Sequence, residues 1–203
     1  MEFIDCWHDD KITPEKMVNG ALGQLPGWKV LEKSDHFTIL KQSIDYCKTK
    51  GNKLLDLGCG AGEVGRVFNN FDYTGADLSN IIENVSKKIN PNLKYTVFDV
   101  YDIDLCSFIK EYDIVLLNAV IDILERPLEG LNNVLKNSQG YVVIHRQNIT
   151  NIETHIKITD AYGGKSFQSY INRDDFYNTI SINNYRIREV FKWGSYSTFI
   201  LEK

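Results

Sequence analysis

Three glycines at alternate positions, directly after an apolar strand, are the residues of this chain best suited to hold a ligand. They are Gly58, Gly60 and Gly62, within the segment 54–63, and Asp56 stands two residues before the first of them. Glycine lacks a Cβ, so such a turn can bend tightly and a ligand can approach its backbone closely. A carboxylate near the end of a buried strand is costly unless a polar or cationic group faces it. The pattern therefore predicts a ligand site lined by backbone, with such a group beside Asp56.

A second carboxylate, Asp77, follows the predicted strand 71–76. A carboxylate at this place can accept hydrogen bonds from both hydroxyls of a ribose, or it can cap the next helix. Gly60, Gly62 and Gly65 also satisfy the G-x-G-x-x-G fingerprint of dinucleotide-binding proteins, and Asp77 follows at nearly the expected spacing of about 20 residues. An NAD(P)-dependent oxidoreductase is therefore one interpretation of the same turn.

The position of the first glycine favours a different family. In the dinucleotide fingerprint the first glycine closes the strand, whereas here Gly58 does so and Asp56 precedes it. Residues 56–62, Asp-Leu-Gly-Cys-Gly-Ala-Gly, resemble the first motif of the class I S-adenosylmethionine-dependent methyltransferases, and the chain is identified as a member of that family. The resemblance implies that the turn, Cys59 included, holds the methionine part of S-adenosylmethionine. It also places Asp56 near the ammonium group and the positive sulfur.

The same resemblance assigns further cofactor contacts and a reaction. Leu78 would pack on the adenine, Asp99 would accept its amino group, and the backbone N–H of Val100 would reach a ring nitrogen. Backbone at Asn118 would line the sulfonium pocket. Residues 118–122 lack the Asn/Asp-Pro-Pro-Tyr signature of enzymes that methylate exocyclic or amide nitrogens. We therefore expect methyl transfer to an oxygen or nitrogen of a small molecule, with a non-catalytic S-adenosylmethionine-binding protein as a further alternative.

His145 is the candidate for a catalytic general base. It ends the predicted strand 140–145 and so belongs to the same edge of the sheet. An imidazole with an ordinary pKa of about 6.5 can accept a proton at neutral pH. The alternative is a hydrogen-bonded histidine with a structural role. Weaker candidates for substrate contact are Trp7, His8, His155 and Tyr162.

The elements that must position these residues alternate between strand and helix, which is typical of a doubly wound α/β fold. The family resemblance adds a mostly parallel seven-stranded sheet with helices on both faces and a C-terminal antiparallel hairpin. The predicted strands are 53–57, 71–76, 94–98, 113–118 and 140–145, followed by the hairpin strands 185–193 and 196–201 around Gly194-Ser195.

Two segments lie outside the motifs. Residues 1–50 are expected to form a helical and loop-rich cap with a helix over 36–48. Residues 148–172 show no sustained period, so we expect an irregular insertion that serves as a substrate lid, followed by a helix over 173–182. The whole chain of 203 residues is predicted to be a single methyltransferase-like domain.

Composition limits the partners. A net charge of −4 argues against a large nucleic-acid footprint, and RNA stays open only if lysines such as Lys87, Lys88, Lys157 and Lys165 gather on one face. No apolar run is long enough to span a membrane, and the N-terminal segment does not resemble a secretion signal. We expect a cytoplasmic protein without a metal site, because the cysteines lack metal-ligand spacing: Cys6, Cys47, Cys59 and Cys106. The oligomeric state is open.

Overall fold

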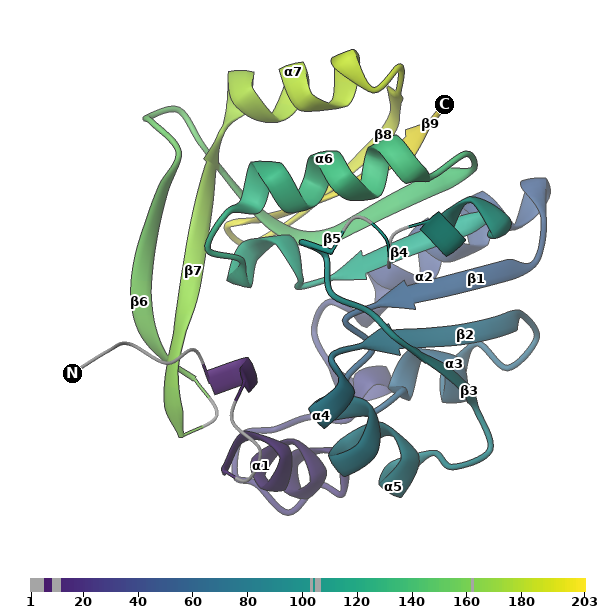
Figure 1. Cartoon of the computed structure of the whole chain (residues 1–203), viewed down its shortest axis with the longest axis vertical. Coiled ribbons are helices and arrows are strands. Elements are labelled where there is room, and N and C mark those ends of the chain that lie inside the picture. Colours follow the sequence, from purple (N-terminus) through teal and green to yellow (C-terminus); the bar gives the residue numbers. More distant parts are fainter. Residues whose placement is uncertain (1–5, 9–11, 103, 105–106, 162) are drawn as a thin grey trace.

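The computed structural model describes residues 6–8, 12–102, 104, 107–161 and 163–203. Strands and helices alternate over most of the chain, as Figure 1 shows. The strands are β1 Lys53–Leu57, β2 Asp72–Asp77, β3 Lys94–Val97, β4 Ile114–Asn118, β5 Tyr141–Thr150, β6 His155–Ala161, β7 Gly164–Asn172, β8 Arg186–Trp193 and β9 Tyr196–Glu202. The α-helices are α1 Ile12–Ala21, α2 Phe37–Cys47, α3 Glu63–Val67, α4 Ser79–Ile81, α5 Lys87–Ile89, α6 Pro127–Asn137 and α7 Arg173–Ile182. A π-helical segment, η4 Ile82–Ser86, joins α4 to α5, and short 3₁₀ turns are η1 Cys6–His8, η2 Leu31–Lys33, η3 Lys48–Lys50, η5 Ser107–Glu111 and η6 Ile121–Ile123.

Seven of the strands form the sheet that the sequence predicts. Strands β3, β2, β1, β4 and β5 are parallel neighbours in that order. Strand β9 then pairs antiparallel with β5, and β8 pairs antiparallel with β9. The predicted fold, a doubly wound and mostly parallel sheet with a C-terminal antiparallel hairpin, is confirmed. The carboxyl ends of the five parallel strands meet at one edge, where open sheets of this kind bind ligands.

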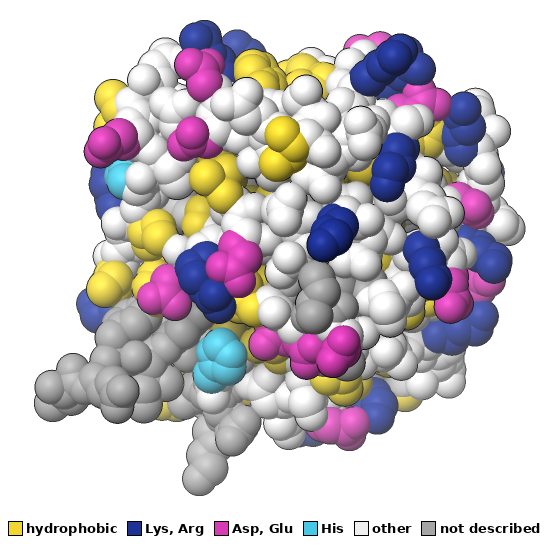
Figure 2. Space-filling model, turned by 45° about the horizontal axis from the view of Figure 1, so that its top comes forward, with side chains coloured by type: hydrophobic (Ala, Val, Ile, Leu, Met, Phe, Trp, Pro, Cys, Tyr) yellow, Lys and Arg dark blue, Asp and Glu magenta, His cyan; other side chains and the backbone are white. Residues whose placement is uncertain are grey.

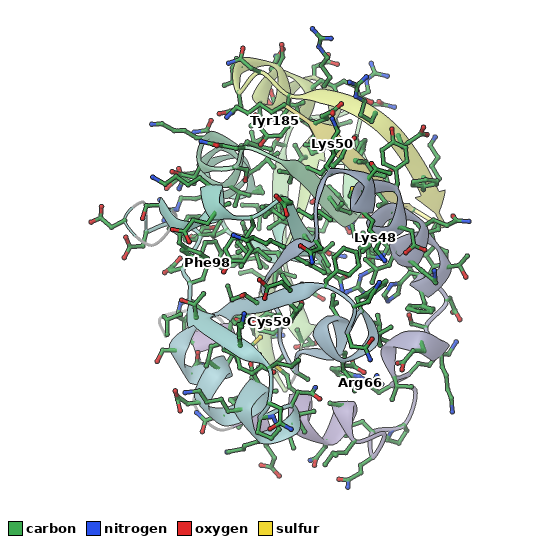
Figure 3. The ribbon with its side chains drawn as sticks, turned by 90° about the vertical axis from the view of Figure 1, so that its right-hand side faces the viewer. Lys48, Lys50, Cys59, Arg66, Phe98 and Tyr185 are labelled. Carbon is green, nitrogen blue, oxygen red and sulfur yellow. The ribbon has the colours of Figure 1, made fainter. Side chains whose placement is uncertain are left out.

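The sheet is covered on both faces because its central strands are apolar on both sides. Leu55 and Leu57 belong to a core with side chains of α6 and α7, whereas Leu54 belongs to a second core with side chains of α2 and α3. Figure 3 shows this division, with Phe98 on the α6 side and Lys48 on the α2 side. The strict alternation of neighbours on β1 therefore holds the whole sheet between two helical layers.

The expectation of an irregular segment at 148–172 is wrong. Strand β5 continues to Thr150, and β6 and β7 form an antiparallel hairpin that stands away from the main sheet in Figure 1. Of the two hairpin strands, β7 is the one that pairs with β5 among the described residues, through Ile149–Ile171 and Thr150–Asn172. Ile158 on β6 is 59% exposed. Backbone pairing, rather than burial of an apolar stripe, maintains this hairpin, so hydrophobic periodicity does not reveal it.

Charges of both signs are interspersed on the surface. Figure 2 shows Lys and Arg side chains lying among Asp and Glu side chains on the visible face. Two of the lysines considered for a basic face are ion-paired, Lys87 with Glu83 and Lys165 with Asp160, each at 2.6 Å. No helix among the described residues has the length and apolar character that crossing a membrane requires.

Candidate active site

A cavity of about 800 Å³ lies at the carboxyl edge of the sheet. Strands β1, β2 and β4 end at its wall, and residues from the N-terminal segment and the β6–β7 hairpin complete it. The predicted cofactor residues gather here, with the single exception of Gly62: Asp56, Gly58, Cys59, Gly60, Asp77, Leu78, Asp99, Val100 and Asn118. Residues spread over more than sixty positions of the chain thus share one space.

The glycine turn is held by hydrogen bonds to the end of β2. The N–H of Gly58 donates to the carbonyl of Ala76 at 2.7 Å. The N–H of Gly60 donates to Asp77 Oδ2 and that of Leu78 to Asp77 Oδ1, both at 2.8 Å. Gly58 and Gly60 have φ angles of +70° and +51°, which L side chains rarely adopt. Asp77 therefore fixes the turn through Oδ2, and each of its two carboxylate oxygens keeps a lone pair for a ligand.

Gly62 has a different role from the one predicted. It precedes α3 as its N-cap with φ +75° and does not line the cavity. A Cβ at this position would lie 2.5 Å from the hydroxyl oxygen of Tyr95. Backbone conformation and packing against Tyr95 explain this glycine, and the assignment of Gly62 to the cofactor site is corrected.

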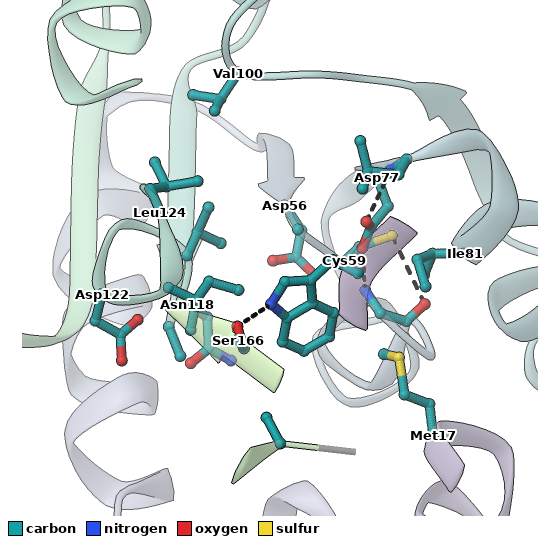
Figure 4. Close-up of a pocket in the computed structure, with 18 of the residues that line it drawn as sticks. Met17, Asp56, Cys59, Asp77, Ile81, Val100, Asn118, Asp122, Leu124 and Ser166 are labelled. Atoms are coloured by element: carbon teal, nitrogen blue, oxygen red, sulfur yellow. Dashed lines mark hydrogen bonds between the residues drawn. The ribbon is translucent and has the colours of Figure 1, made fainter. Parts of the chain in front are cut away.

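Asp56 is a buried carboxylate with one oxygen unused. Its exposed fraction is 1%, and its Oδ2 accepts a hydrogen bond from the hydroxyl of Tyr73 at 2.9 Å. Among the described residues, Oδ1 has no hydrogen-bond partner. Burial raises the pKa of Asp56 to about 7, while the Tyr73 hydrogen bond opposes that shift. Figure 4 shows Asp56 in the middle of the cavity, where a cationic ligand group would satisfy its free oxygen.

The π-helical segment η4 contacts the glycine turn through Ser86. The Ser86 hydroxyl donates to the carbonyl of Gly60 at 2.6 Å. Ser86 Oγ also lies 3.9 Å from Cys59 Sγ. Burial raises the pKa of the Cys59 thiol well above its ordinary value, so this cysteine stays protonated and contributes shape rather than a nucleophile. Irregular helical segments of this kind often occur at functional sites.

The structure corrects the assignment of His145 as a general base. The ring is 2% exposed and does not line the cavity. Its Nε2 lies 3.0 Å from His36 Nδ1 and its Nδ1 lies 2.7 Å from Thr198 Oγ1. Burial and the neighbouring His36 and Arg146 lower its pKa to about 2. With both ring nitrogens engaged and no contact with the cavity, His145 is a structural histidine.

Sequence reasoning missed several polar residues of the cavity wall. Asp122 lies on η6, directly after β4, and Arg146 follows His145 on β5. Ser166 and Gln168 project from β7. The pairing of β5 with β9 shifts register between Ile144 and Gln147, and this bulge turns Arg146 toward the cavity. The place of Asp122 behind a strand end could have revealed it, but nothing in the sequence marks the bulge.

Trp7 joins the N-terminal segment to the hairpin across the cavity. Its indole N–H donates to Ser166 Oγ at 2.8 Å, and its carbonyl accepts a hydrogen bond from Asn80 Nδ2 at 2.9 Å. His8 lines the cavity as well. His155 instead stacks on Tyr170 at a ring-centre distance of 4.9 Å, on the hairpin surface. Of the weaker candidates, Tyr162 lies outside the described residues and His155 does not line the cavity.

The described residues contain no group of three or more His, Cys, Asp or Glu side chains that could hold a metal ion. The fold and the site thus define a doubly wound α/β protein with a ligand site at its switch point. A methyltransferase-domain family profile matches residues 34–189, and the chain belongs to this methyltransferase family. The family and the class I fold predicted from the glycine motif are confirmed.

Several solved structures share the fold. CalS10, an amino pentose methyltransferase from Micromonospora echinaspora solved with S-adenosylmethionine, aligns with a TM-score of 0.60 at 15% identity, over 83% of this chain and 91% of that one. A methyltransferase from Mesorhizobium loti aligns with 0.61 at 13%, over 84% and 98%. KedS8, a sugar N-methyltransferase from Streptoalloteichus, aligns with 0.58 at 13%, over 82% and 85%. No curated protein sequence matches the chain.

Proposed function

We propose that this protein transfers a methyl group from S-adenosylmethionine to an oxygen or nitrogen of a small-molecule acceptor. The unpartnered oxygen of buried Asp56, beside the left-handed turn of Gly58 and Gly60, carries the proposal. Together they offer backbone donors, open space at the turn and a carboxylate that lacks a counter-charge. Among the solved structures that share the fold, CalS10 acts on an amino pentose and KedS8 on a sugar, which supports a small acceptor.

S-adenosylmethionine supplies an electrophilic methyl group on a positively charged sulfur, so the chain needs no covalent nucleophile of its own. We assign the carboxyl and amino groups of the methionine part to the backbone of the glycine turn and to Asp56. Asp77 would hold the ribose, while Leu78, Asp99 and Val100 would surround the adenine, and Asn118 would lie at the sulfonium. Orientation of two bound reactants alone can lower a barrier by roughly 7–11 kcal/mol.

The N-terminal cap and the β6–β7 hairpin would enclose the acceptor. Trp7 bonds to Ser166 from the cap side, and Thr159, Phe167 and Gln168 of the hairpin line the cavity. These segments lie outside the cofactor motifs, and peripheral segments commonly vary with substrate. A cytoplasmic location stays a prediction, supported by the free thiols of Cys6, Cys47 and Cys59. The acidic balance of the chain and the paired surface lysines support an acceptor other than nucleic acid.

Isothermal calorimetry with S-adenosylmethionine and with NADPH, each in a separate titration, tests the cofactor. We expect binding of S-adenosylmethionine only; binding of NADPH only would contradict the proposal and restore the oxidoreductase alternative. Mass spectrometry of a panel of amines, hydroxylated rings and sugars, incubated with cofactor and protein, tests the transfer. Cofactor binding without a methylated product in a broad panel would favour a non-catalytic binding protein.

A further inference from the structure

The cavity has a second end that the cofactor assignments reach only at Asn118, which would lie between the sulfonium and the acceptor. In Figure 4, Asp122 and Asn118 lie on the opposite side of the view from Asp77 and Cys59, with Asp56 between the two groups. Side chains from η6, β4, β5 and β7 meet at this second end, which we call the acceptor end and define by Asn118, Asp122, Arg146, Ser166 and Gln168.

Three polar atoms at the acceptor end lack partners among the described residues. They are Asp122 Oδ1, Asn118 Oδ1 and Arg146 Nε. Asp122 is only 9% exposed. Buried polar atoms in folded proteins nearly always have a hydrogen-bond partner, and exceptions call for an explanation such as a ligand. A carboxylate oxygen and an amide oxygen that both lack donors indicate a ligand that supplies N–H or O–H groups.

The backbone beside these side chains adopts a conformation that residues other than glycine rarely adopt. Ala119 and Arg146 have φ angles of +55° and +64°, although neither is glycine. The N–H of Ala119 donates to the carbonyl of His145 at 3.0 Å, which ties Ala119 to the residue that precedes Arg146. The ring of His145 is held by His36 and Thr198, which fixes the residue whose carbonyl accepts this bond. Strain of this kind persists where the surroundings enforce it, and it is concentrated at ligand sites.

The charges of the cavity select the sign of the ligand. Six carboxylates line it, whereas Arg146 is the sole Arg or Lys among its described lining residues. The acids are Asp56, Glu63, Asp77, Asp99, Asp122 and Glu125. Away from the backbone donors of the glycine turn, such an excess favours a cationic second ligand over an anionic one. Because Asp56 is assigned to the cofactor, Asp122 is the buried carboxylate that remains for a second, positively charged or donor-rich ligand.

We infer that the acceptor is a small polar amine, that Asp122 binds its amino group, and that the reaction is N-methylation. This inference rests on the proposed function. The protonated amine gives one proton to the Asp122 carboxylate, and its lone pair then forms the new C–N bond. The C–S bond breaks and leaves its electron pair on a neutral thioether. Arg146 supports the negative charge of Asp122 and donates to a neutral oxygen of the acceptor, and the Asn118 amide oxygen accepts a second amine hydrogen.

A matched pair of ring compounds tests the inference directly. Binding of trans-4-aminocyclohexanol and of trans-1,4-cyclohexanediol is measured by saturation-transfer NMR and calorimetry on the protein saturated with S-adenosylhomocysteine. We expect the amine to bind at least about tenfold more tightly than the diol, because a charged hydrogen bond replaces a neutral one. We also expect the amine, and not the diol, to gain a methyl group when S-adenosylmethionine replaces the product analogue.

Asp122→Asn should remove that preference while S-adenosylhomocysteine binding stays within about twofold. Glu125→Gln is the matched control, because it removes one cavity carboxylate that is exposed to solvent, and the preference for the amine should persist. Equal affinity for the two probes, no binding of the amine, or an unchanged preference in Asp122→Asn would overturn the inference. Absence of S-adenosylhomocysteine binding to the wild-type protein would instead contradict the proposed function. Failure of the inference and failure of the proposed function are therefore distinguishable.

Discussion

The two ends of the cavity are built in different ways. The cofactor end consists of one short turn, whose backbone N–H groups bond to Ala76 and Asp77 at the tip of the neighbouring strand. The acceptor end consists of side chains from separate elements, placed by a bulge in β5 and a 3₁₀ turn after β4. Local backbone geometry thus determines the first end, and long-range packing determines the second. We therefore expect substitutions that strain the backbone to disrupt binding at the cofactor end. At the acceptor end, we expect removal of a single charged side chain, or of a residue that supports one, to have the main effect.

The largest effect is expected at the turn itself. Gly60→Val places a β-branched side chain at φ +51°, with its Cβ 3.1 Å from Met17 Cε. The turn must then change shape, and the N–H that bonds to Asp77 moves with it. We expect affinity for S-adenosylmethionine to fall more than about 100-fold, or about 2.7 kcal/mol.

Gly194→Val is the matched control for this variant. Gly194 has φ +55° at the turn between β8 and β9, and no atom lies within 4 Å of its Cβ position. Both variants strain a left-handed glycine, and calorimetry on both separates strain from loss of the site. Equal loss of affinity in the two variants would show that the Gly60 turn is not a binding element.

Asp56→Asn should weaken cofactor binding and stabilise the protein in the absence of cofactor. Burial raises the pKa of Asp56 to about 7, above the ordinary value of 3.8. The stability that protonated Asp56 provides is complete below pH 3.8 and is lost as pH rises through about 7. We expect Asp56→Asn to unfold less readily at pH 8 by on the order of 2 kcal/mol, with a smaller gain at pH 5, while cofactor affinity falls about tenfold.

Urea unfolding at pH 5 and pH 8 measures the stability, and calorimetry measures the affinity. Asp72→Asn serves as control, because Asp72 lies at the exposed start of β2, paired with Lys94. An equal stability gain in the control would show that burial of Asp56 is not the cause of the gain. An Asp56→Asn protein that binds cofactor like the wild type would remove Asp56 from the cofactor end.

The last effect concerns the support of the acceptor end and leaves the cofactor end unchanged. Burial lowers the pKa of His36 to about 4 and that of His145 to about 2. Stability from the two neutral rings is therefore complete above pH 6.5 and is lost as pH falls toward 4, by up to about 1.4 kcal/mol per pH unit for each ring. His145→Gln should reduce this slope in urea unfolding between pH 7 and pH 5, whereas His155→Gln on the exposed hairpin should not. An unchanged slope in His145→Gln would exclude the His pair as its source.

The contrast between the ends also explains what the sequence could predict. Strand β4 was recognisable because it is buried on both faces and therefore nearly all apolar. The cofactor end was recognisable because its glycines stand at alternate positions in one short segment, and this spacing follows from backbone geometry. The family match at 34–189 agrees with that interpretation.

The acceptor end could not be predicted in the same way. His145 lies at the expected edge of the sheet, beside Asn118 in register. Its role is decided by His36 and Thr198, which lie 109 and 53 positions away in the chain. Arg146 reaches the cavity only because β5 bulges against β9. Such placement depends on tertiary pairing, to which residue type and spacing give no access.

The attachment of the β6–β7 hairpin suggests how relatives of this protein can diverge. Among the described residues, the hairpin pairs with the main sheet through two residue pairs, Ile149–Ile171 and Thr150–Asn172. The Ser169 hydroxyl adds one bond to the carbonyl of Ile121. Replacement of the β6–β7 hairpin by that of a related chain would alter the cavity wall near Asp122 and leave the glycine turn intact. Evolution can therefore change what such a protein methylates without rebuilding the means by which it does so.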